Sequence, residues 1–274
     1  MNTRILTVQD ISCVGQCSLT VALPILSACG LETAILPSAV LSTHTGGFKG
    51  FTFRDLSEDI PAIGRHWQKE GILFDAMYTG YLGSARQVDM VLELYRTVCK
   101  PGAPLVVDPA MADNGVLYTG FDDNYVQAMK RLCQKATVLL PNVTEACFLT
   151  DTPYLADFSE DFVEELQQKM MQMGCKKGIL TGACADPKQT GVSVWEEEGS
   201  KKYLHRRVPV GSHGTGDVYA SAFMGAWMNG NSLFDSAVIA ADFTLDCIEN
   251  NEKDHWYGVQ FEPRLPGLIR RLGF

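Results

Sequence analysis

The chain has 274 residues, 46% of them hydrophobic and 20% charged, which is typical of one large or two small globular domains. Its net charge of -9 at pH 7 argues against a nucleic-acid-binding protein, because such surfaces carry an excess of Lys and Arg. The apolar stretch 21–41 is interrupted by Pro24, Glu32 and Pro37, so we expect no membrane-spanning helix.

The nine cysteines are odd in number and form no Cys-x-x-Cys pair, Cys13 and Cys17 being the nearest neighbours. The N-terminus enters a β-like stretch at once, without the basic and apolar segments of a signal peptide. Together these features predict reduced, mostly buried thiols in a cytoplasmic protein.

Short apolar runs alternate with helical patterns along the first two thirds of the chain. The apolar runs predict strands at 4–8, 33–41, 75–82, 104–109, 136–142 and 177–182. The intervening patterns predict helices at 15–30, 57–70, 85–99, 122–134 and 159–173. This alternation is typical of an α/β fold in which helices cover both faces of a largely parallel sheet.

The last third of the chain has a different pattern. Two alternating segments, 190–196 and 201–210, flank a turn-prone Glu-Glu-Gly-Ser sequence and predict an antiparallel hairpin at one sheet edge. Helical periods follow at 216–229 and 233–249, and Gly-Asn-Ser at 230–232 separates them. Because no repeat or linker interrupts the chain, we expect a single three-layer α/β/α domain over residues 1–274.

Polar residues or glycines follow most of the predicted strands. In an open α/β sheet, ligands bind at the carboxyl ends of the strands, where these residues gather along one edge. The residues concerned are Asp10, Thr79-Gly80-Tyr81, Asp108-Pro109, Pro141-Asn142 and Thr181-Gly182. The chain contains neither a P-loop nor a Gly-x-Gly-x-x-Gly motif, so a nucleotide at this edge must be held in another way.

A glycine-rich segment precedes the helix predicted at 216–229. The amides of Gly214, Thr215 and Gly216 can hold an anion, such as a transferred phosphoryl group, and Asp217 can accept the proton of an attacking hydroxyl. A turn followed by a helix cap explains the same residues equally well.

Two further segments carry carboxylates near predicted strand ends. Asp108 and Asp113 suit a hydrated Mg²⁺, although a solvated turn is slightly favoured. Asn142 and Glu145 have the spacing of a capping box, which is the favoured interpretation, and Glu145 can also bond a metal-bound water.

The segment 41–51 is rich in glycine and polar residues and predicts a mobile substrate flap, with His44 and Thr45 as candidate ligand contacts. A lone histidine is more often structural. The other four histidines have no ligand spacing, so a zinc site is not expected.

Taken in order, these segments resemble the ribokinase-like superfamily and, within it, the pyridoxal kinase branch. The resemblance covers nearly the whole chain. It is carried by Ser-Thr-His-Thr-Gly-Gly at 42–47, Val-Val-Asp-Pro-Ala-Met-Ala-Asp-Asn-Gly at 106–115, Leu-Leu-Pro-Asn-Val-Thr-Glu-Ala at 139–146 and His-Gly-Thr-Gly-Asp at 213–217.

The resemblance implies ATP-dependent phosphorylation of the 5'-hydroxymethyl group of a B6 vitamer (pyridoxal, pyridoxamine or pyridoxine) in pyridoxal 5'-phosphate salvage. It implies Mg²⁺, with a monovalent cation as a further candidate, and a homodimer. It makes Asp217 the base and Gly214, Thr215 and Gly216 the anion hole.

The resemblance also implies the roles of the remaining candidates. ATP contacts fall on Asp108, Asn142, Glu145, Thr181 and the nucleotide-pocket segment Val208, Pro209, Val210 and Gly211. Magnesium-water positions fall on Asp113 and Glu145. Acceptor contacts fall on Asp10, His44, Thr45, Tyr81 and Asp217.

The chain departs from the family pattern at two positions. Gln9 is followed by Asp10, where the family usually has the Ser that bonds the acceptor ring, which shifts the expected preference towards pyridoxamine or hydroxymethylpyrimidine. Gly47 replaces the usual aromatic residue after His-Thr-Gly, with Phe48 one position later.

Two alternatives remain open. One is a kinase for hydroxymethylpyrimidine or another small alcohol. The other is a non-catalytic B6-binding protein of the same fold, although Asp113, Glu145 and Asp217 argue for an enzyme.

Overall fold

A nine-stranded sheet forms the centre of the protein. The computed structural model describes residues 3–209, 213–252 and 254–274. In the order in which they lie side by side, the strands are β11 (Gly199–Arg206), β10 (Gln189–Glu196), β9 (Gly178–Thr181), β8 (Val138–Leu139), β5 (Leu105–Val107), β4 (Ala76–Thr79), β1 (Arg4–Ser12), β2 (Glu32–Leu41) and β3 (Phe53–Asp55). The six strands from β9 to β2 are parallel, whereas β10, β11 and β3 are antiparallel additions at the two edges.

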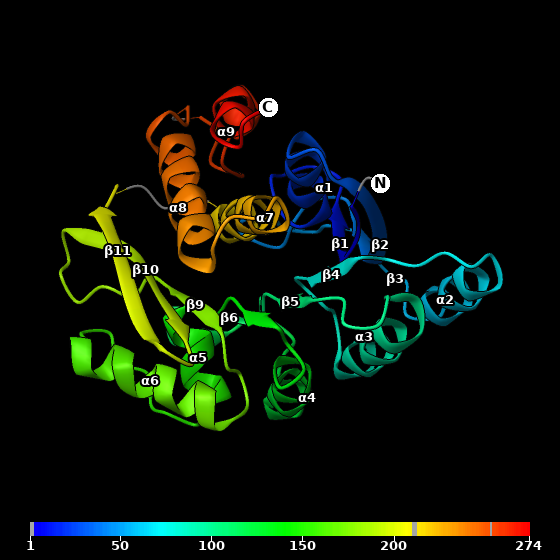
Figure 1. Ribbon diagram of the computed structural model, residues 1–274, viewed down its shortest axis with the longest axis horizontal. Coiled ribbons are helices and arrows are strands. Elements are labelled where there is room, and N and C mark those ends of the chain that lie inside the picture. Colours follow the sequence, from blue (N-terminus) through cyan, green and yellow to red (C-terminus); the bar gives the residue numbers. More distant parts are fainter. Residues whose placement is uncertain (1–2, 210–212, 253) are drawn as a thin grey trace.

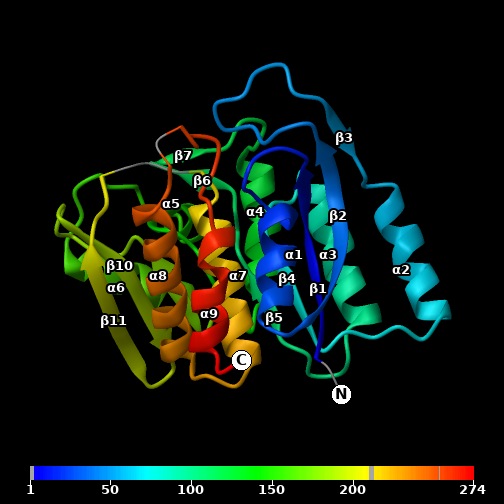
Figure 2. The same cartoon turned by 90° about the horizontal axis from the view of Figure 1, so that it is seen from above.

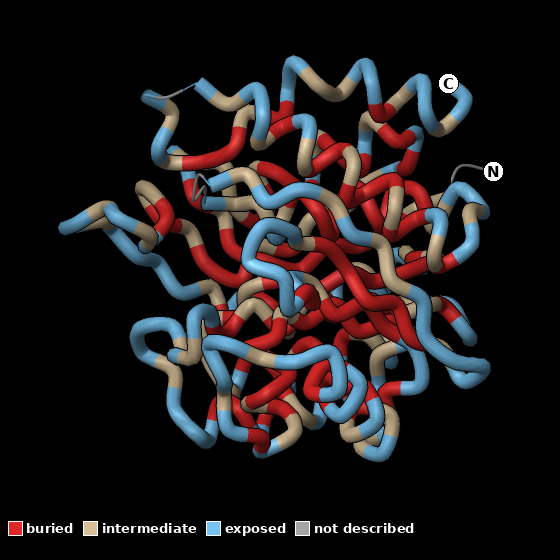
Figure 3. Tube along the Cα trace, turned by 90° about the vertical axis from the view of Figure 1, so that its left-hand side faces the viewer, coloured by how far each residue is buried: buried red, intermediate tan, exposed pale blue. Residues whose placement is uncertain are grey.

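Helices cover both faces of the sheet (Figure 1). One face carries α1 (Leu19–Ala28), α7 (Thr215–Met228), α8 (Leu233–Glu249) and α9 (Leu265–Arg271). The other face carries α2 (Asp59–Lys69), α3 (Ala85–Val98), α4 (Asp123–Cys133), α5 (Val143–Leu149) and α6 (Glu160–Gln172). Each helix layer encloses its own apolar core against the sheet, and Figure 3 shows the buried strands between the layers. The predicted α/β fold, with a mostly parallel sheet and a hairpin at one edge, is confirmed.

The local sequence explains where these elements begin. β4 and β5 are buried along their whole length, as continuous apolar runs between two helix layers must be. Ser84 and Asp122 cap α3 and α4 through their side chains, and Ser232 caps α8, as the Gly-Asn-Ser sequence predicts. No helix among the described residues is long and apolar enough to cross a membrane.

Several predicted boundaries were wrong. The helix expected from residue 15 begins only at Leu19, because the amides of Cys13 and Gln16 bond the distant carbonyls of Leu41 and Tyr257. The second hairpin strand, expected to residue 210, ends at Arg206. The strand β3, the short hairpin of β6 (Ala112–Asp113) and β7 (Val116–Leu117), the 3₁₀ turn (Glu262–Arg264) and α9 were not predicted.

The thiols agree with the prediction of a reduced protein. All nine cysteines are free, and six of them are buried. The carboxyl ends of the parallel strands lie at one end of the molecule, together with the β2–β3 loop, the β6–β7 hairpin and the connection between α8 and α9 (Figure 2). The functional residues are found at this end.

Candidate active site

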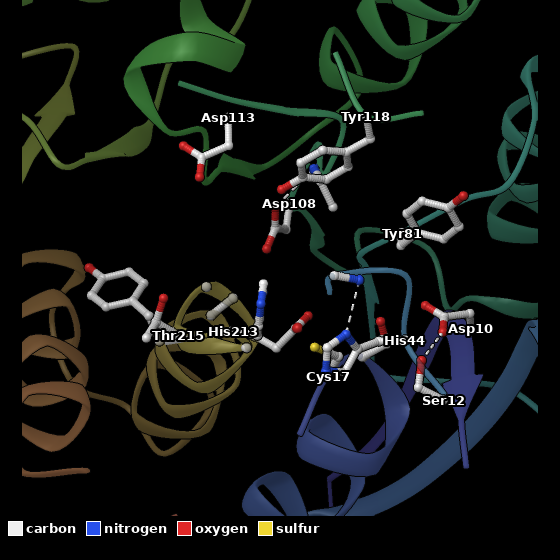
Figure 4. Close-up of a pocket in the computed structure, with 18 of the residues that line it drawn as sticks. Asp10, Ser12, Cys17, His44, Tyr81, Asp108, Asp113, Tyr118, His213 and Thr215 are labelled. Atoms are coloured by element: carbon white, nitrogen blue, oxygen red, sulfur yellow. Dashed lines mark hydrogen bonds between the residues drawn. The ribbon is translucent and has the colours of Figure 1, made fainter. Parts of the chain in front are cut away.

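A cavity of about 500 Å³ opens at the carboxyl ends of the strands. It brings together residues that are up to 210 positions apart in the chain, from Asp10 to Ala220. Figure 4 shows side chains from both halves of the chain pointing into it. Its lining includes these predicted residues: Asp10, His44, Thr45, Tyr81, Asp108, Asp113, Asn142, Glu145, Thr181, Gly214, Thr215, Gly216 and Asp217.

Two of the predicted residues that the structure describes are not in this lining. Val208 and Pro209 do not contribute to it, and Val210 and Gly211 lie outside the described residues. Conversely, the cavity contains residues that the sequence reasoning missed, namely Ser12, Cys17, Ser18, Tyr118 and His213. Ser12 was open to prediction, because it lies two positions after Asp10 on β1 and side chains of a strand alternate between faces.

The loop before α7 has the geometry of an anion site. Gly214 precedes the helix in the left-handed conformation, with φ 78°, and no side chain caps the first turn. A side chain at this position would also overlap the carbonyl oxygen of Gln16. Glycine therefore turns the chain so that first-turn amides remain available at the N-terminus of a 14-residue helix, whose dipole favours an anion.

Asp217 lies in the first turn of α7, at the wall of the cavity. Burial raises the pKa of its carboxyl from 3.8 to about 7; a backbone hydrogen bond from Ser18 opposes this shift, and the charge of Asp10 adds to it. A group that titrates near neutral pH suits general-base work. The cap interpretation explains the position of Asp217 but not the cost of burying its charge.

Cys17 also lines the cavity, but it is not a second base. Burial and the carboxylates of Asp217 and Asp10 raise the pKa of its thiol far above neutrality. The thiolate, which is the reactive form, is therefore suppressed at this position.

Asn142 and Glu145 form the predicted capping box at the start of α5. The Asn142 side chain accepts a hydrogen bond from the Glu145 amide at 2.9 Å, and the Asn142 amide donates to Glu145 Oε2 at 2.8 Å. Glu145 Oε1 accepts from the Met111 amide at 3.0 Å. The buried carboxylate thus fixes the loop that carries Asp108 and Asp113, and it still lines the cavity.

Three carboxyl groups, those of Asp108, Glu145 and Asp217, lie on the side of the cavity near α5 and α7. Burial, together with the charges of Glu145 and Asp217, raises the pKa of Asp108 well above its usual range. Burial also raises the pKa of Glu145, although the backbone amides that bond it act in the opposite direction. These shifts reflect the burial of the carboxyls and, for Asp108, their closeness to one another.

The described cavity lining holds five carboxyls, from Asp10, Asp108, Asp113, Glu145 and Asp217, and no Lys or Arg. A triphosphate cannot bind beside these groups unless cations neutralise the repulsion. No cluster of three His, Cys, Asp or Glu side chains in the described ranges is close enough to hold a metal by itself. The donor set therefore fits Mg²⁺, which keeps several waters and shares its ligands with substrate phosphates.

Asp10 is the charged residue at the opposite side of the cavity (Figure 4). The register between β1 and β2 shifts beside it, so that two residues of β2 oppose this one residue. The Ser12 hydroxyl donates to Asp10 Oδ2 at 3.0 Å. Burial raises the pKa of Asp10, and hydrogen bonds from Ser18 and Ser12 oppose this. A serine hydroxyl thus lies beside Asp10, two residues after the position at which the family pattern has Ser.

The comparisons with known proteins agree with this geometry. Residues 57–259 match the model of the family described as phosphomethylpyrimidine kinase. This match spans more than half of the chain. The protein belongs to the phosphomethylpyrimidine kinase family.

Three relatives show the range of the family. A Bacteroides thetaiotaomicron VPI-5482 protein, assigned as a phosphomethylpyrimidine kinase and crystallised with pyridoxal, is 37% identical, with a TM-score of 0.92 over 98% of this chain and 96% of that chain. The pyridoxal kinase of Lactobacillus plantarum is 33% identical, with a TM-score of 0.88 over 98% and 97% of the two chains. A hydroxymethylpyrimidine/phosphomethylpyrimidine kinase of Bacillus subtilis is 26% identical over 225 residues, which are 80% of this chain and 77% of the relative.

These matches support the pyridoxal kinase branch of the ribokinase-like superfamily, as the motifs indicated. The protein is an ATP-dependent small-molecule kinase of the phosphomethylpyrimidine kinase family. The homodimer and the monovalent cation stay predictions.

Gly214→Ala should destabilise the protein, because alanine must adopt a left-handed conformation and its side chain meets the Gln16 carbonyl. We expect a loss of at least about 2 kcal/mol in the free energy of unfolding, measured by urea denaturation. Gly216→Ala is the matched control, since no atom lies within 4 Å of its added side chain and φ is not positive. Equal stability of the two variants would contradict this account of the loop.

Proposed function

We propose that this kinase transfers the γ-phosphoryl group of ATP to the 5'-hydroxymethyl group of a B6 vitamer, with Asp217 as general base. The observation that carries the proposal is the position of this carboxyl. It has a pKa of about 7 and lies in the first turn of α7, beside free helix amides, in the cavity that also contains Asp10. A base and an anion site that share one helix turn suit the attack of an alcohol on a terminal phosphate.

In the proposed step, Asp217 accepts the proton of the acceptor's hydroxyl group. The hydroxyl oxygen of the acceptor attacks the γ-phosphorus at the same time. The bond from the γ-phosphorus to the bridging oxygen breaks, and ADP leaves with that electron pair. The amides of Gly214, Thr215 and Gly216 stabilise the charge on the transferred group. Because phosphoryl transfer needs little covalent chemistry from the protein, placement of these groups supplies most of the acceleration.

The acidic side of the cavity would hold the nucleotide and its metal. Asp113 and Glu145 would bond waters of Mg²⁺, while Asp108, Asn142 and Thr181 would face the phosphates. When bound, Mg²⁺ supplies positive charge that offsets the triphosphate. The segment 208–211 would lie along the nucleotide, a role that rests on the family resemblance alone.

A second acceptor class, hydroxymethylpyrimidine, is favoured by one observation. Asp10 presents a buried carboxyl to the acceptor side of the cavity. When ionised, it accepts hydrogen bonds, so it suits a ring with a protonated nitrogen or an amino group. Pyridoxamine and hydroxymethylpyrimidine both carry an amino substituent, whereas pyridoxal and pyridoxine do not.

An acceptor panel tests the proposed function directly. The purified protein with Mg²⁺ and ATP is offered pyridoxal, pyridoxamine, pyridoxine and hydroxymethylpyrimidine, with ribose and adenosine as controls. We expect ADP release and a product heavier by one phosphoryl group for at least one vitamer, both measured against a reaction without acceptor. Phosphorylation of a control acceptor alone would overturn the assignment.

Asp10→Ser should change the preference within this panel. Loss of a charged hydrogen bond costs about 1.5–3 kcal/mol, so we expect kcat/KM for pyridoxamine and hydroxymethylpyrimidine to fall by at least about tenfold relative to pyridoxal. Ser12→Ala is the control, because it leaves the charge of Asp10 in place. An unchanged ratio in Asp10→Ser would show that this carboxyl does not select the acceptor.

Asp217→Asn should lower kcat by at least about a hundredfold, the low end for general-base catalysis. In the unaltered protein, kcat/KM for the acceptor should rise with pH through an apparent pKa near 7, because Asp217 acts when deprotonated. Turnover close to the unaltered rate in the Asn variant would exclude Asp217 as the base.

Asp217→Asn should also be more stable than the unaltered protein at high pH. A carboxyl whose folded-state pKa is raised binds its proton more tightly in the folded protein, so its cost accumulates between pH 4 and 7 and persists above. Asp217→Asn removes that cost. Thermal unfolding should therefore show a higher Tm for the variant at pH 8 and a smaller difference at pH 5.

A further inference from the structure

A short segment near the C-terminus crosses three loops around the cavity. We name residues 255–261 the C-terminal strap and residues 42–50 the acceptor flap. The Tyr257 carbonyl accepts hydrogen bonds from the Gln16 amide at 3.4 Å and lies 2.7 Å from His44 Nε2. The Val259 amide donates to the His213 carbonyl at 3.2 Å. The strap thus joins the β1–α1 loop, the acceptor flap and the start of the anion loop.

The strap is fixed in its own right. Val259 and Phe261 are buried in the apolar core that also contains side chains of α7 and α8. Asn251 brackets the strap, because its Oδ1 accepts from the Gln260 amide at 3.0 Å and its Nδ2 donates to the Gly258 carbonyl at 3.3 Å. Anchored side chains and a bracketed backbone make it a support for the loops that it crosses.

His44 is the polar link between the flap and the strap. Its Nε2 lies 2.7 Å from the Tyr257 carbonyl, and its Nδ1 accepts from the Gly46 amide at 3.1 Å. This pair of partners requires the neutral tautomer with the proton on Nε2. Both ring nitrogens are engaged, so the buried ring holds the flap in this conformation and offers no nitrogen to an acceptor.

An aromatic contact forms the second link. The rings of Phe48 and Trp256 are 4.7 Å apart, and the ring of Phe48 also lies 5.0 Å from that of His44. Gly47 has a φ of 84°, and a side chain there would come within 2.9 Å of the Trp256 ring. Gly47 and Phe48 are also the positions at which the flap departs from the family pattern. The glycine lets the flap lie directly against the strap.

Trp256 itself lies outside the cavity lining and is 51% exposed. Its ring touches the outer side of the flap, whose Thr45 and Gly46 line the cavity. Its other ring contact is with the neighbouring Tyr257 of the strap, at 5.9 Å, so the contact with Phe48 is the one that reaches the flap.

We propose that the C-terminal strap positions the acceptor flap, with His44 and Trp256 as positioning residues that set acceptor affinity. The strap holds Thr45 and Gly46 against the acceptor side of the cavity from behind. It thereby reduces the freedom that the flap must lose when the acceptor binds. The kinetic part of this inference rests on the proposed function, whereas the mechanical part does not.

Hydrogen–deuterium exchange of peptides that cover residues 42–50 tests the mechanical part without any substrate. Trp256→Ala should speed exchange of the flap amides by about threefold to tenfold, the range of one aromatic pair. Trp256→Phe should restore protection, because it keeps an aromatic ring opposite Phe48. Phe274→Ala, which removes another exposed aromatic ring, should leave the flap unchanged. Equal exchange rates in Trp256→Ala and the unaltered protein would overturn the proposal that the strap orders the flap.

Steady-state kinetics with an acceptor that the unaltered protein phosphorylates test the positioning role. Trp256→Ala should raise the acceptor KM by a factor similar to its effect on exchange, while the KM for ATP stays the same. Faster flap exchange with an unchanged acceptor KM would overturn the positioning role. If the unaltered protein phosphorylates no vitamer or pyrimidine, the proposed function fails. The exchange experiment still decides whether the strap orders the flap.

Two substitutions of His44 separate its two bonds. His44→Gln keeps a donor with the reach of Nε2 for the Tyr257 carbonyl, whereas His44→Asn keeps only an acceptor near Nδ1 for the Gly46 amide. We expect flap exchange and acceptor KM to rise more in the Asn variant than in the Gln variant. The reverse order would overturn the role of His44 as a link to the strap.

Discussion

The excess of negative charge in the cavity is the constraint on which the site depends. Five carboxyls line a space of about 500 Å³, with no Lys or Arg in the described part of its wall. Arginine side chains in a binding site supply the positive charge that a phosphate needs. The described lining of this cavity has none, so that charge must come from another source. Its anion binding has to come from backbone amides and from cations that arrive with the nucleotide. The proposed role of Mg²⁺ follows from this arrangement, whereas the raised carboxyl pKa values follow mainly from burial.

The backbone responds to that constraint at the start of α7. The uncapped first turn, the left-handed Gly214 and the neighbouring carboxyl of Asp217 occupy one helix turn. The turn provides partial positive charge where no side chain does. Burial acts in the opposite direction on Asp217 and raises the pKa of its carboxyl to about 7. Burial of this carboxyl costs stability, and the proposed role of Asp217 as general base accounts for the persistence of that cost.

The acceptor side is built on a different principle. Asp10 lies at a shift in the register between β1 and β2. The acceptor flap contacts the C-terminal strap, a segment that ends more than 200 residues later in the sequence. Loops that must open for a substrate cannot be buried, so their order has to come from neighbours that are themselves anchored. Val259 and Phe261 anchor the strap in the core, and Trp256 connects the strap to the flap through its contact with Phe48.

The sequence by itself determined the layer architecture and most of the cavity wall, because strand and helix periods and the motif order are local properties. Asp108, Asn142, Glu145 and Asp217 follow strands or open helices, and a parallel sheet gathers such positions at one edge. Only the tertiary structure decided which of their partners matter. The missing basic residues, the pairing of Ser12 with Asp10 and the bond from His44 to Tyr257 depend on segments that meet only after folding. No local pattern encodes a contact across 213 residues, so the strap was out of reach of the sequence alone.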